Sequence, residues 1–140
     1  MVVGLDIYDK VASDKPFNYG DVLITKSGKP GIMLAHVATV GAKPDEQFGV
    51  VLRAMFKVLV SANSLGLKSI AVPEIGTGIF GSLTSEQSAK AIFGAIAKFT
   101  TIYPEASIEE VTLVIYRGST SFAEKVLSER SYVNIQNVYD

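Results

Sequence analysis

The 140-residue chain contains no cysteine and only one histidine, His36. Without cysteine the chain has no disulfide bond, no thiolate metal site and no cysteine nucleophile. A single histidine is a poor metal site on its own, so the sequence predicts neither a metal nor a cofactor. His36 lies within an apolar run and has no carboxylate close to it in sequence. A core histidine with one hydrogen bond is therefore a better interpretation than a general base.

Long apolar runs are also missing. The longest are too short to span a bilayer, and the N-terminus lacks the basic region and long apolar core of a signal peptide. We therefore expect a protein of the cytoplasm or of another reducing compartment, without a membrane partner. Neither sign of charge is in excess, since 13 lysine and arginine residues face 14 aspartate and glutamate residues. This balance argues against a broad nucleic-acid surface but suits a small anionic ligand held by backbone groups.

The chain does contain enough apolar residues for one folded domain. Hydrophobic residues make up 48% of the sequence and charged residues 19%, which is typical of a globular protein with a core. No repeat, low-complexity segment or linker interrupts it. We therefore expect residues 1–140 to form a single layered α/β domain.

The most informative stretch is residues 69–81, where an apolar run leads into a glycine-rich loop. Residues 70–72 are apolar without polar alternation, which predicts a strand buried on both faces of a parallel sheet. Pro73 cannot donate a hydrogen bond to a neighbouring strand, so it should end this one. The three glycines that follow allow positive φ angles and a close approach of the backbone to a ligand.

A helix should begin directly after this loop. Thr84 fits the N-cap position, and Gln87 stands three residues later, as in a capping box. A helix N-terminus attracts anions because its free N–H groups and its dipole both favour negative charge. Strand, loop and helix together predict a phosphate-sized anion site, although a glycine pair alone also occurs in ordinary strand-to-helix turns.

The remaining elements are predicted from hydrophobic periodicity. Strands are expected at residues 21–25, 32–38 and 111–116, with 32–38 in the interior of a sheet and an edge strand at 132–138. Helices are expected from residue 46 to about residue 62 and over residues 119–127. Residues 2–12 are ambiguous between an edge strand and a helix, and we favour the helix.

Residues 20–128 resemble the larger, C-terminal part of a macro domain, the ADP-ribose-binding module. The resemblance is best at residues 69–81, Ser-Ile-Ala-Val-Pro-Glu-Ile-Gly-Thr-Gly-Ile-Phe-Gly, which are similar to the family's strand and second phosphate loop. An apolar strand leading into His36, and the strand at 111–116 followed by a helix containing Phe122, support it. The resemblance implies a three-layer α/β/α domain with a mixed, mostly parallel central sheet, shortened at its N-terminus relative to the family.

Two motifs of the family have no counterpart. A macro domain normally carries an aspartate that binds adenine, followed by Asn-Ala-Ala-Asn and a glycine triplet that grip the other phosphate and contribute to de-ADP-ribosylation. The chain has neither the Asn-Ala-Ala-Asn segment nor the glycine triplet. In one register residues 21–25 match the family's third strand and the adenine aspartate is missing. In the other register Asp21 is that aspartate, but the order of the downstream elements favours the first.

The resemblance implies a ligand site formed mainly by the backbone N–H groups of the glycine-rich loop. The loop residues are Ile75, Gly76, Thr77, Gly78, Ile79, Phe80 and Gly81. Phe80 would contact a ribose and Tyr116 would lie near adenine, although either ring could instead close the core. Asp21 joins the site only in the second register. Glu74 replaces a small residue of the family and places a carboxylate beside the diphosphate, where like charges repel.

Three functions remain as alternatives. The chain binds ADP-ribose or a related nucleotide diphosphate, free or on an ADP-ribosylated protein. Alternatively, it hydrolyses an ADP-ribosyl bond or an ADP-ribose phosphate, with catalytic residues that the sequence does not identify because the family's catalytic loop is not recognisable. The third alternative is a degenerate macro-like domain with a structural or protein-interaction role, in which a second copy or another chain covers an exposed sheet edge. We rank binding above catalysis.

Overall fold

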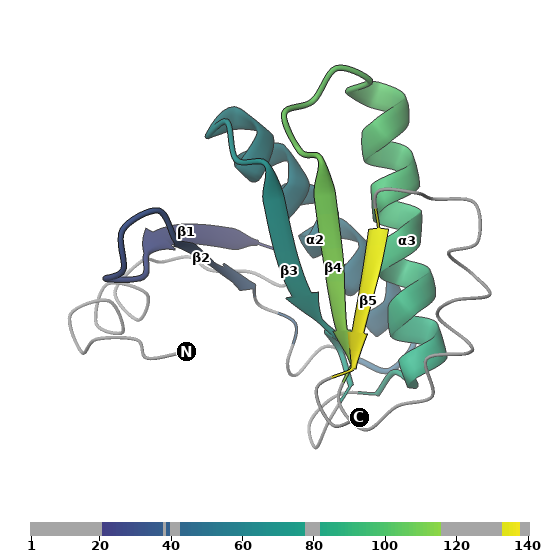
Figure 1. Ribbon diagram of the computed structural model, residues 1–140. Helices are drawn as coiled ribbons and strands as arrows, with labels where there is room; N and C mark the ends of the chain where they lie inside the picture. Colours follow the sequence, from purple (N-terminus) through teal and green to yellow (C-terminus); the bar gives the residue numbers. More distant parts are fainter. Residues whose placement is uncertain (1–20, 38, 40–42, 78–81, 116–132, 138–140) are drawn as a thin grey trace.

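The computed structural model describes residues 21–37, 39, 43–77, 82–115 and 133–137. These residues form a three-stranded sheet, a separate two-stranded hairpin and two long helices (Figure 1). The predicted helices at residues 2–12 and 119–127 lie outside the described residues.

The three-stranded sheet is parallel throughout. Its strands are β3 (Ser69–Pro73), β4 (Glu110–Ile115) and β5 (Val133–Asn137), in the order β3-β4-β5. The predicted edge strand near the C-terminus is confirmed as β5. β3 and β4 are joined through helix α3 (Ser85–Ile102) in a β-α-β unit. The C-terminal ends of parallel strands meet at one edge of a sheet, so the loop after β3 lies where β4 also ends.

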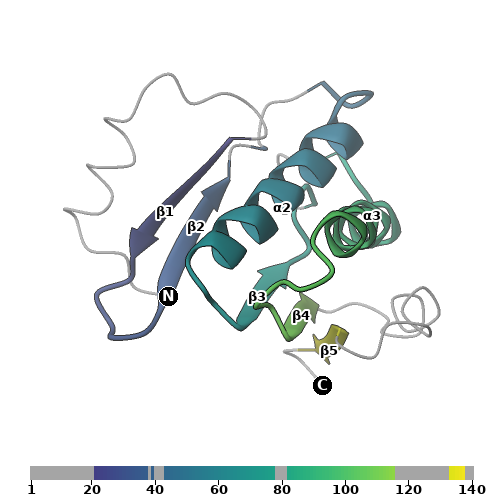
Figure 2. The same ribbon diagram turned by 90° about the horizontal axis from the view of Figure 1, so that it is seen from above.

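Helices α2 (Gln47–Ser64) and α3 lie side by side on one face of this sheet (Figure 2). Their inner faces and the inward residues of β3 and β4 form the core. Its largest fully buried apolar members are Met55, Leu59, Ile92, Ile96 and Leu113. The two helices approach closely at Gly94, where an added β-carbon would lie 3.3 Å from Leu52 Cδ1. The described residues thus contribute one helical layer and the sheet of the predicted α/β fold.

Both long helices were predicted, and both are confirmed. α2 ends in a Schellman motif, because Gly66 adopts φ +69° and its N–H donates to Asn63 O at 3.0 Å, while Leu67 N–H donates to Ala62 O at 3.0 Å. Within the part of the chain that the structure describes, neither helix is long and apolar enough to cross a membrane.

The hairpin consists of β1 (Val22–Lys26) and β2 (Met33–Val37), paired antiparallel with Val22 opposite Val37. Gly28 and Gly31 have φ angles of +88° and +78° in the turn that joins the strands. Side chains also link the strands, since His36 Nε2 lies 2.9 Å from Thr25 Oγ1. This contact supplies the one hydrogen bond predicted for His36, but the side chain is half-buried and is not part of the core as predicted.

Two burial predictions are wrong. β3 is covered on one face only, because Ile70 and Val72 face the helices while Ser69, Ala71 and Pro73 are exposed. β2 is not an interior strand of the described fold, since β1 is its only partner among the described strands and the preceding Ile32 is 50% exposed. In both strands apolar composition suggested two covered faces. Coverage depends on the neighbouring layers, and no described helix lies on the outer face of the parallel sheet (Figure 2).

Candidate functional site

The candidate site lies at the edge of the parallel sheet where β3 ends. α3 begins at this edge, and the first half of α2 reaches it as well, because Val51 of α2 contacts the loop at Gly76. The described part of the connection between β3 and α3 consists of residues 74–77 and 82–84. Its geometry is therefore set by one strand and by the first turns of two helices.

Gly76 is required by the shape of the loop. Its φ angle is +87°, in the region that favours glycine. An added β-carbon would lie 2.8 Å from Val51 Cγ2, closer than real β-carbons approach other atoms, and 3.0 Å from Leu83 Cδ1, which is tighter than most real contacts. The positive φ angle and the lack of room for a β-carbon therefore both favour glycine at this position.

Hydrogen bonds fold the loop back on itself. Ile75 N–H donates to Pro73 O at 2.8 Å, and Thr77 Oγ1 donates to Glu74 O at 2.8 Å. Leu83 N–H donates to Gly76 O at 3.1 Å, so the two described ends of the loop are joined across residues 78–81. The loop is therefore held at its base by its own backbone.

α3 holds the loop from the other side through Ser88. This residue is fully buried, and its Oγ donates to Ile75 O at 2.6 Å. The bond fixes the orientation of the peptide that joins Ile75 to Gly76, because a trans peptide is planar and its C=O and N–H point in opposite directions. Gly76 N–H must therefore point away from Ser88.

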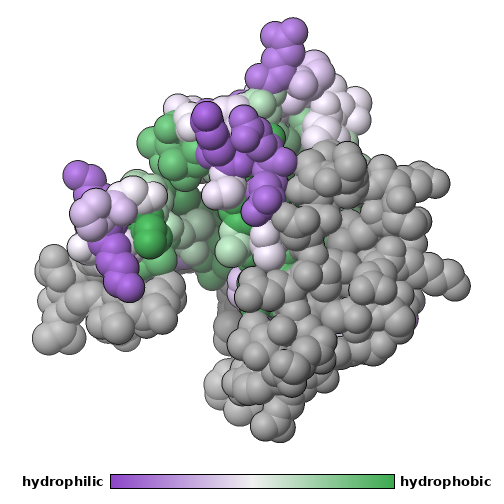
Figure 3. Space-filling view, viewed as in Figure 1, coloured by the Kyte–Doolittle hydropathy of each residue, from purple (hydrophilic) through white to green (hydrophobic). Residues whose placement is uncertain are grey.

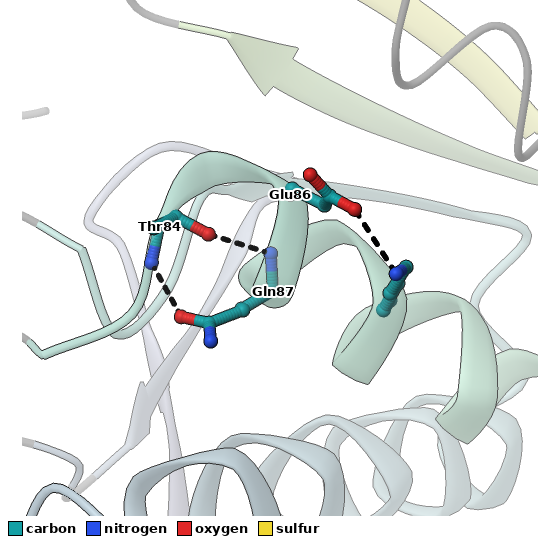
Figure 4. Close-up of polar contacts among 4 residues, drawn as sticks. Thr84, Glu86 and Gln87 are labelled. Carbon is teal, nitrogen blue, oxygen red and sulfur yellow. Dashed lines mark hydrogen bonds and ion pairs between the residues drawn. The ribbon is translucent and has the colours of Figure 1, made fainter.

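The N-terminus of α3 is capped, as the sequence predicted. Thr84 Oγ1 accepts a hydrogen bond from Gln87 N–H at 3.1 Å, and Gln87 Oε1 accepts one from Thr84 N–H at 2.9 Å (Figure 4). Glu86 lies in the same turn and forms an ion pair with Lys90 at 3.0 Å. The cap and the carboxylate already satisfy part of the helix terminus, so α3 offers an anion less than an uncapped helix would. Anion binding here depends mainly on the loop.

Glu74 lies between the end of β3 and the loop, and it is half-buried. Its backbone carbonyl accepts the Thr77 hydroxyl, so its backbone supports the turn. Its carboxylate is the negative charge that is predicted to be unfavourable for a diphosphate ligand.

The structure describes only part of the predicted site. Ile75, Gly76 and Thr77 lie together in the loop, whereas Gly78, Ile79, Phe80, Gly81 and Tyr116 lie outside the described residues. Asp21 precedes β1, and its Oδ1 accepts a hydrogen bond from Lys57 Nζ of α2 at 3.0 Å. The carboxylate proposed for adenine in the second register is thus engaged in an ion pair.

Sequence reasoning missed the residues that support the loop from outside it. Ser88 occupies a small polar position on the buried face of α3, and Val51 is one apolar residue among many on α2. The unusual burial of this serine follows from its helical position one turn before the apolar Ala91 and Ile92, which the sequence shows. Its partner, the Ile75 carbonyl, becomes evident only from the fold.

Comparisons with known proteins agree with this architecture. The family model for the Macro domain matches residues 5–92. Among solved structures, the macro domain of ganglioside induced differentiation associated protein 2 is similar, with a TM-score of 0.73 and 17% sequence identity; the match covers 89% of this chain and 63% of that one. The family match covers more than half of the chain, so the chain belongs to the macro domain family.

Two curated proteins are also similar, and both carry the description "uncharacterized". One, from Thermotoga maritima, is 29% identical over 99 residues, which cover 67% of this chain and 16% of that protein. The other, from Pyrobaculum aerophilum, is 37% identical over 83 residues, which cover 55% of this chain and 44% of that protein. The chain thus spans less than half the length of either relative.

Proposed function

We propose that the chain binds ADP-ribose or a related nucleotide diphosphate through residues 75–81. The observation that carries this proposal is the conformation of Gly76, which places a backbone with no side chain at the end of β3 between Val51 and Leu83. Membership of the macro domain family, which is known for ADP-ribose binding, supports the choice of ligand.

The ligand groups would be backbone N–H groups. In the described loop, the N–H groups of Ile75 and Leu83 already donate to carbonyls of the loop at 2.8 and 3.1 Å, and that of Thr77 lies 3.4 Å from Glu74 O. We assign the diphosphate to Gly76 N–H together with the N–H groups of residues 78–81. Neutral donors of this kind suit a chain that carries no excess of basic residues.

Binding is a better proposal than hydrolysis of an ADP-ribosyl bond. Hydrolysis requires a group that activates or orients water beside the ligand. In the described loop, residues 74–77 and 82–84, Glu74 is the only side chain that could act as an acid or base. Its position beside the diphosphate would weaken ligand binding, so we assign it no catalytic role.

A matched pair of variants tests the binding proposal. Gly78→Glu places a side chain and a negative charge in the proposed phosphate loop, whereas Thr101→Glu adds the same charge in the last turn of α3. An 18-residue helix is about 27 Å long, so the second charge lies far from the loop. Calorimetric titration with ADP-ribose should show binding by the Thr101→Glu chain and none by the Gly78→Glu chain. Equal affinities of the two variants for ADP-ribose would show that the loop is not part of the binding site.

An interaction role is a second candidate, favoured by the exposed side of β3. Among the described strands β3 lies at one edge of its sheet, and Ser69, Ala71 and Pro73 are exposed on its outer face. Figure 3 shows apolar surface in a hollow between the hairpin and this sheet. We propose that a second copy of the chain covers the exposed side of β3. Sedimentation of the chain at twice its 15.0 kDa mass would support this role, and a monomer at all concentrations would remove it.

A further inference from the structure

We infer that Ser88 is a positioning residue for the ligand, because its hydroxyl orients the Ile75–Gly76 peptide so that Gly76 N–H faces the diphosphate. The inference rests on the proposed function and adds a residue outside the loop to the site. It starts from one contact, the 2.6 Å hydrogen bond from Ser88 Oγ to Ile75 O.

Three neighbouring peptide units of the loop are each held by a different hydrogen bond. The Glu74 carbonyl accepts the Thr77 hydroxyl, and the Gly76 carbonyl accepts Leu83 N–H. Between them, the Ile75 carbonyl accepts the Ser88 hydroxyl. The first two bonds lie within the connection between β3 and α3, whereas the third ties this connection to the body of α3. Among the described residues beyond residue 84, Ser88 is thus the one whose side chain is hydrogen-bonded to the backbone of residues 74–77.

The burial of Ser88 makes its hydroxyl an effective anchor. The side chain is fully buried, between the apolar face of α3 and the loop, and a buried hydroxyl without a partner is costly. The Ile75 carbonyl is the acceptor that satisfies it. Flipping the Ile75–Gly76 peptide would leave the hydroxyl without this acceptor, so Ser88 opposes that flip.

Glycine makes such an anchor necessary. Glycine has no side chain and can therefore adopt more backbone conformations than any other residue type. Gly76 uses this freedom, with a φ angle of +87°. The side chains of Val51 and Leu83 restrict the space around Gly76 Cα through apolar groups, and Leu83 N–H holds the following peptide by donating to Gly76 O. The Ser88 hydroxyl supplies the directional contact that selects one peptide orientation. A preoriented N–H group binds an anion without first having to be ordered.

The test compares Ser88→Ala with Ser107→Ala in ADP-ribose titrations. Ser107 is a matched control, because its hydroxyl also donates to a backbone carbonyl, Leu67 O, at 2.8 Å. Leu67 lies two residues before the start of β3, at the sheet edge opposite the loop. Each variant loses a hydroxyl that donates to a backbone carbonyl, and Ser107→Ala also loses the 3.4 Å contact of Ser107 Oγ with Asn63 Oδ1. We expect Ser88→Ala to lower the affinity for ADP-ribose roughly tenfold, as for the loss of one well-oriented bond to a charged group, and Ser107→Ala to leave it unchanged.

A second ligand separates positioning from a general loss of structure. Adenosine has no diphosphate, so Ser88→Ala should leave the affinity for adenosine unaltered. The amide proton of Gly76 should also shift on addition of ADP-ribose to the wild-type chain, and by much less in Ser88→Ala. Wild-type affinity for ADP-ribose in Ser88→Ala overturns the inference, and so does an equal loss in Ser107→Ala. If the wild-type chain itself does not bind ADP-ribose, the proposed function is overturned. This outcome is distinct from the two outcomes that overturn the inference about Ser88.

Discussion

Gly76 and Val51 lie so close together that a β-carbon on Gly76 would be 2.8 Å from Val51 Cγ2. This contact joins the loop after β3 to the first half of α2, and Leu83 and Ser88 complete the enclosure of the loop from the side of α3. The loop is thus held by both helices rather than by β3 alone. Substitutions at these contacts should change both the stability of the fold and the affinity for the ligand. Substitutions elsewhere should change only one of these two quantities.

Gly76→Ala should destabilise the fold more than Gly66→Ala. Both residues have positive φ, but a β-carbon on Gly66 would meet nothing within 4 Å. We expect Gly66→Ala to cost about 1–2 kcal/mol for the left-handed backbone alone, and Gly76→Ala about 2–4 kcal/mol because overpacking adds to it. Urea unfolding of the two variants measures the difference. Equal losses would mean that the contact with Val51 relaxes without cost.

Thr84→Ala should remove the cap of α3. The threonine hydroxyl accepts Gln87 N–H at 3.1 Å, so the variant leaves that donor without its partner (Figure 4). Loss of such an N-cap costs about 1 kcal/mol, which thermal or urea unfolding detects. Thr101→Ala removes a threonine hydroxyl from the other end of the helix, where it donates to Ala97 O, and serves as control. A stability loss no larger than that of the control would contradict a capping role.

Glu74→Gln should strengthen the binding of ADP-ribose. The variant keeps the size of the side chain and removes the negative charge that we place beside the diphosphate. Two like charges about 4 Å apart repel by about 1 kcal/mol in bulk water and by more near a protein surface, so we expect a gain in affinity of at least roughly fivefold. Glu105→Gln removes an exposed charge in the segment after α3 and should have no effect. Unchanged affinity in Glu74→Gln would show that its carboxylate points away from the ligand.

Asp21→Asn should have little effect on stability or on ADP-ribose affinity. The ion pair of Asp21 with Lys57 is partly exposed, with side-chain accessibilities of 32% and 44%, and such pairs contribute less than about 1 kcal/mol. An unchanged affinity agrees with the register in which residues 21–25 match the family's third strand. A large loss of affinity for ADP-ribose, with no loss for a phosphate lacking adenine, would restore Asp21 as the adenine aspartate.

Local patterns were sufficient to predict the elements around the loop. The spacing of apolar residues located α2 and α3, and Thr84 with Gln87 located the start of α3. These features depend on residues at most a few positions apart. The alternation near the C-terminus likewise located β5, which pairs with β4.

Contacts between distant segments could not be predicted in this way. The Ser88–Ile75 bond, the Asp21–Lys57 ion pair and the Asn63–Ser107 hydrogen bond join residues 13, 36 and 44 positions apart. The burial of β2 and β3 was overestimated for a related reason. A strand's composition does not reveal whether a second layer covers its outer face.

The central claim is that the loop after β3 binds a nucleotide diphosphate. Calorimetric titration of the wild-type chain with ADP-ribose tests it most directly, with thermal unfolding in the presence of ligand as a second readout. We predict saturable heat with one ligand per chain and a rise in the unfolding temperature. No heat and no thermal shift at millimolar ADP-ribose would contradict the claim.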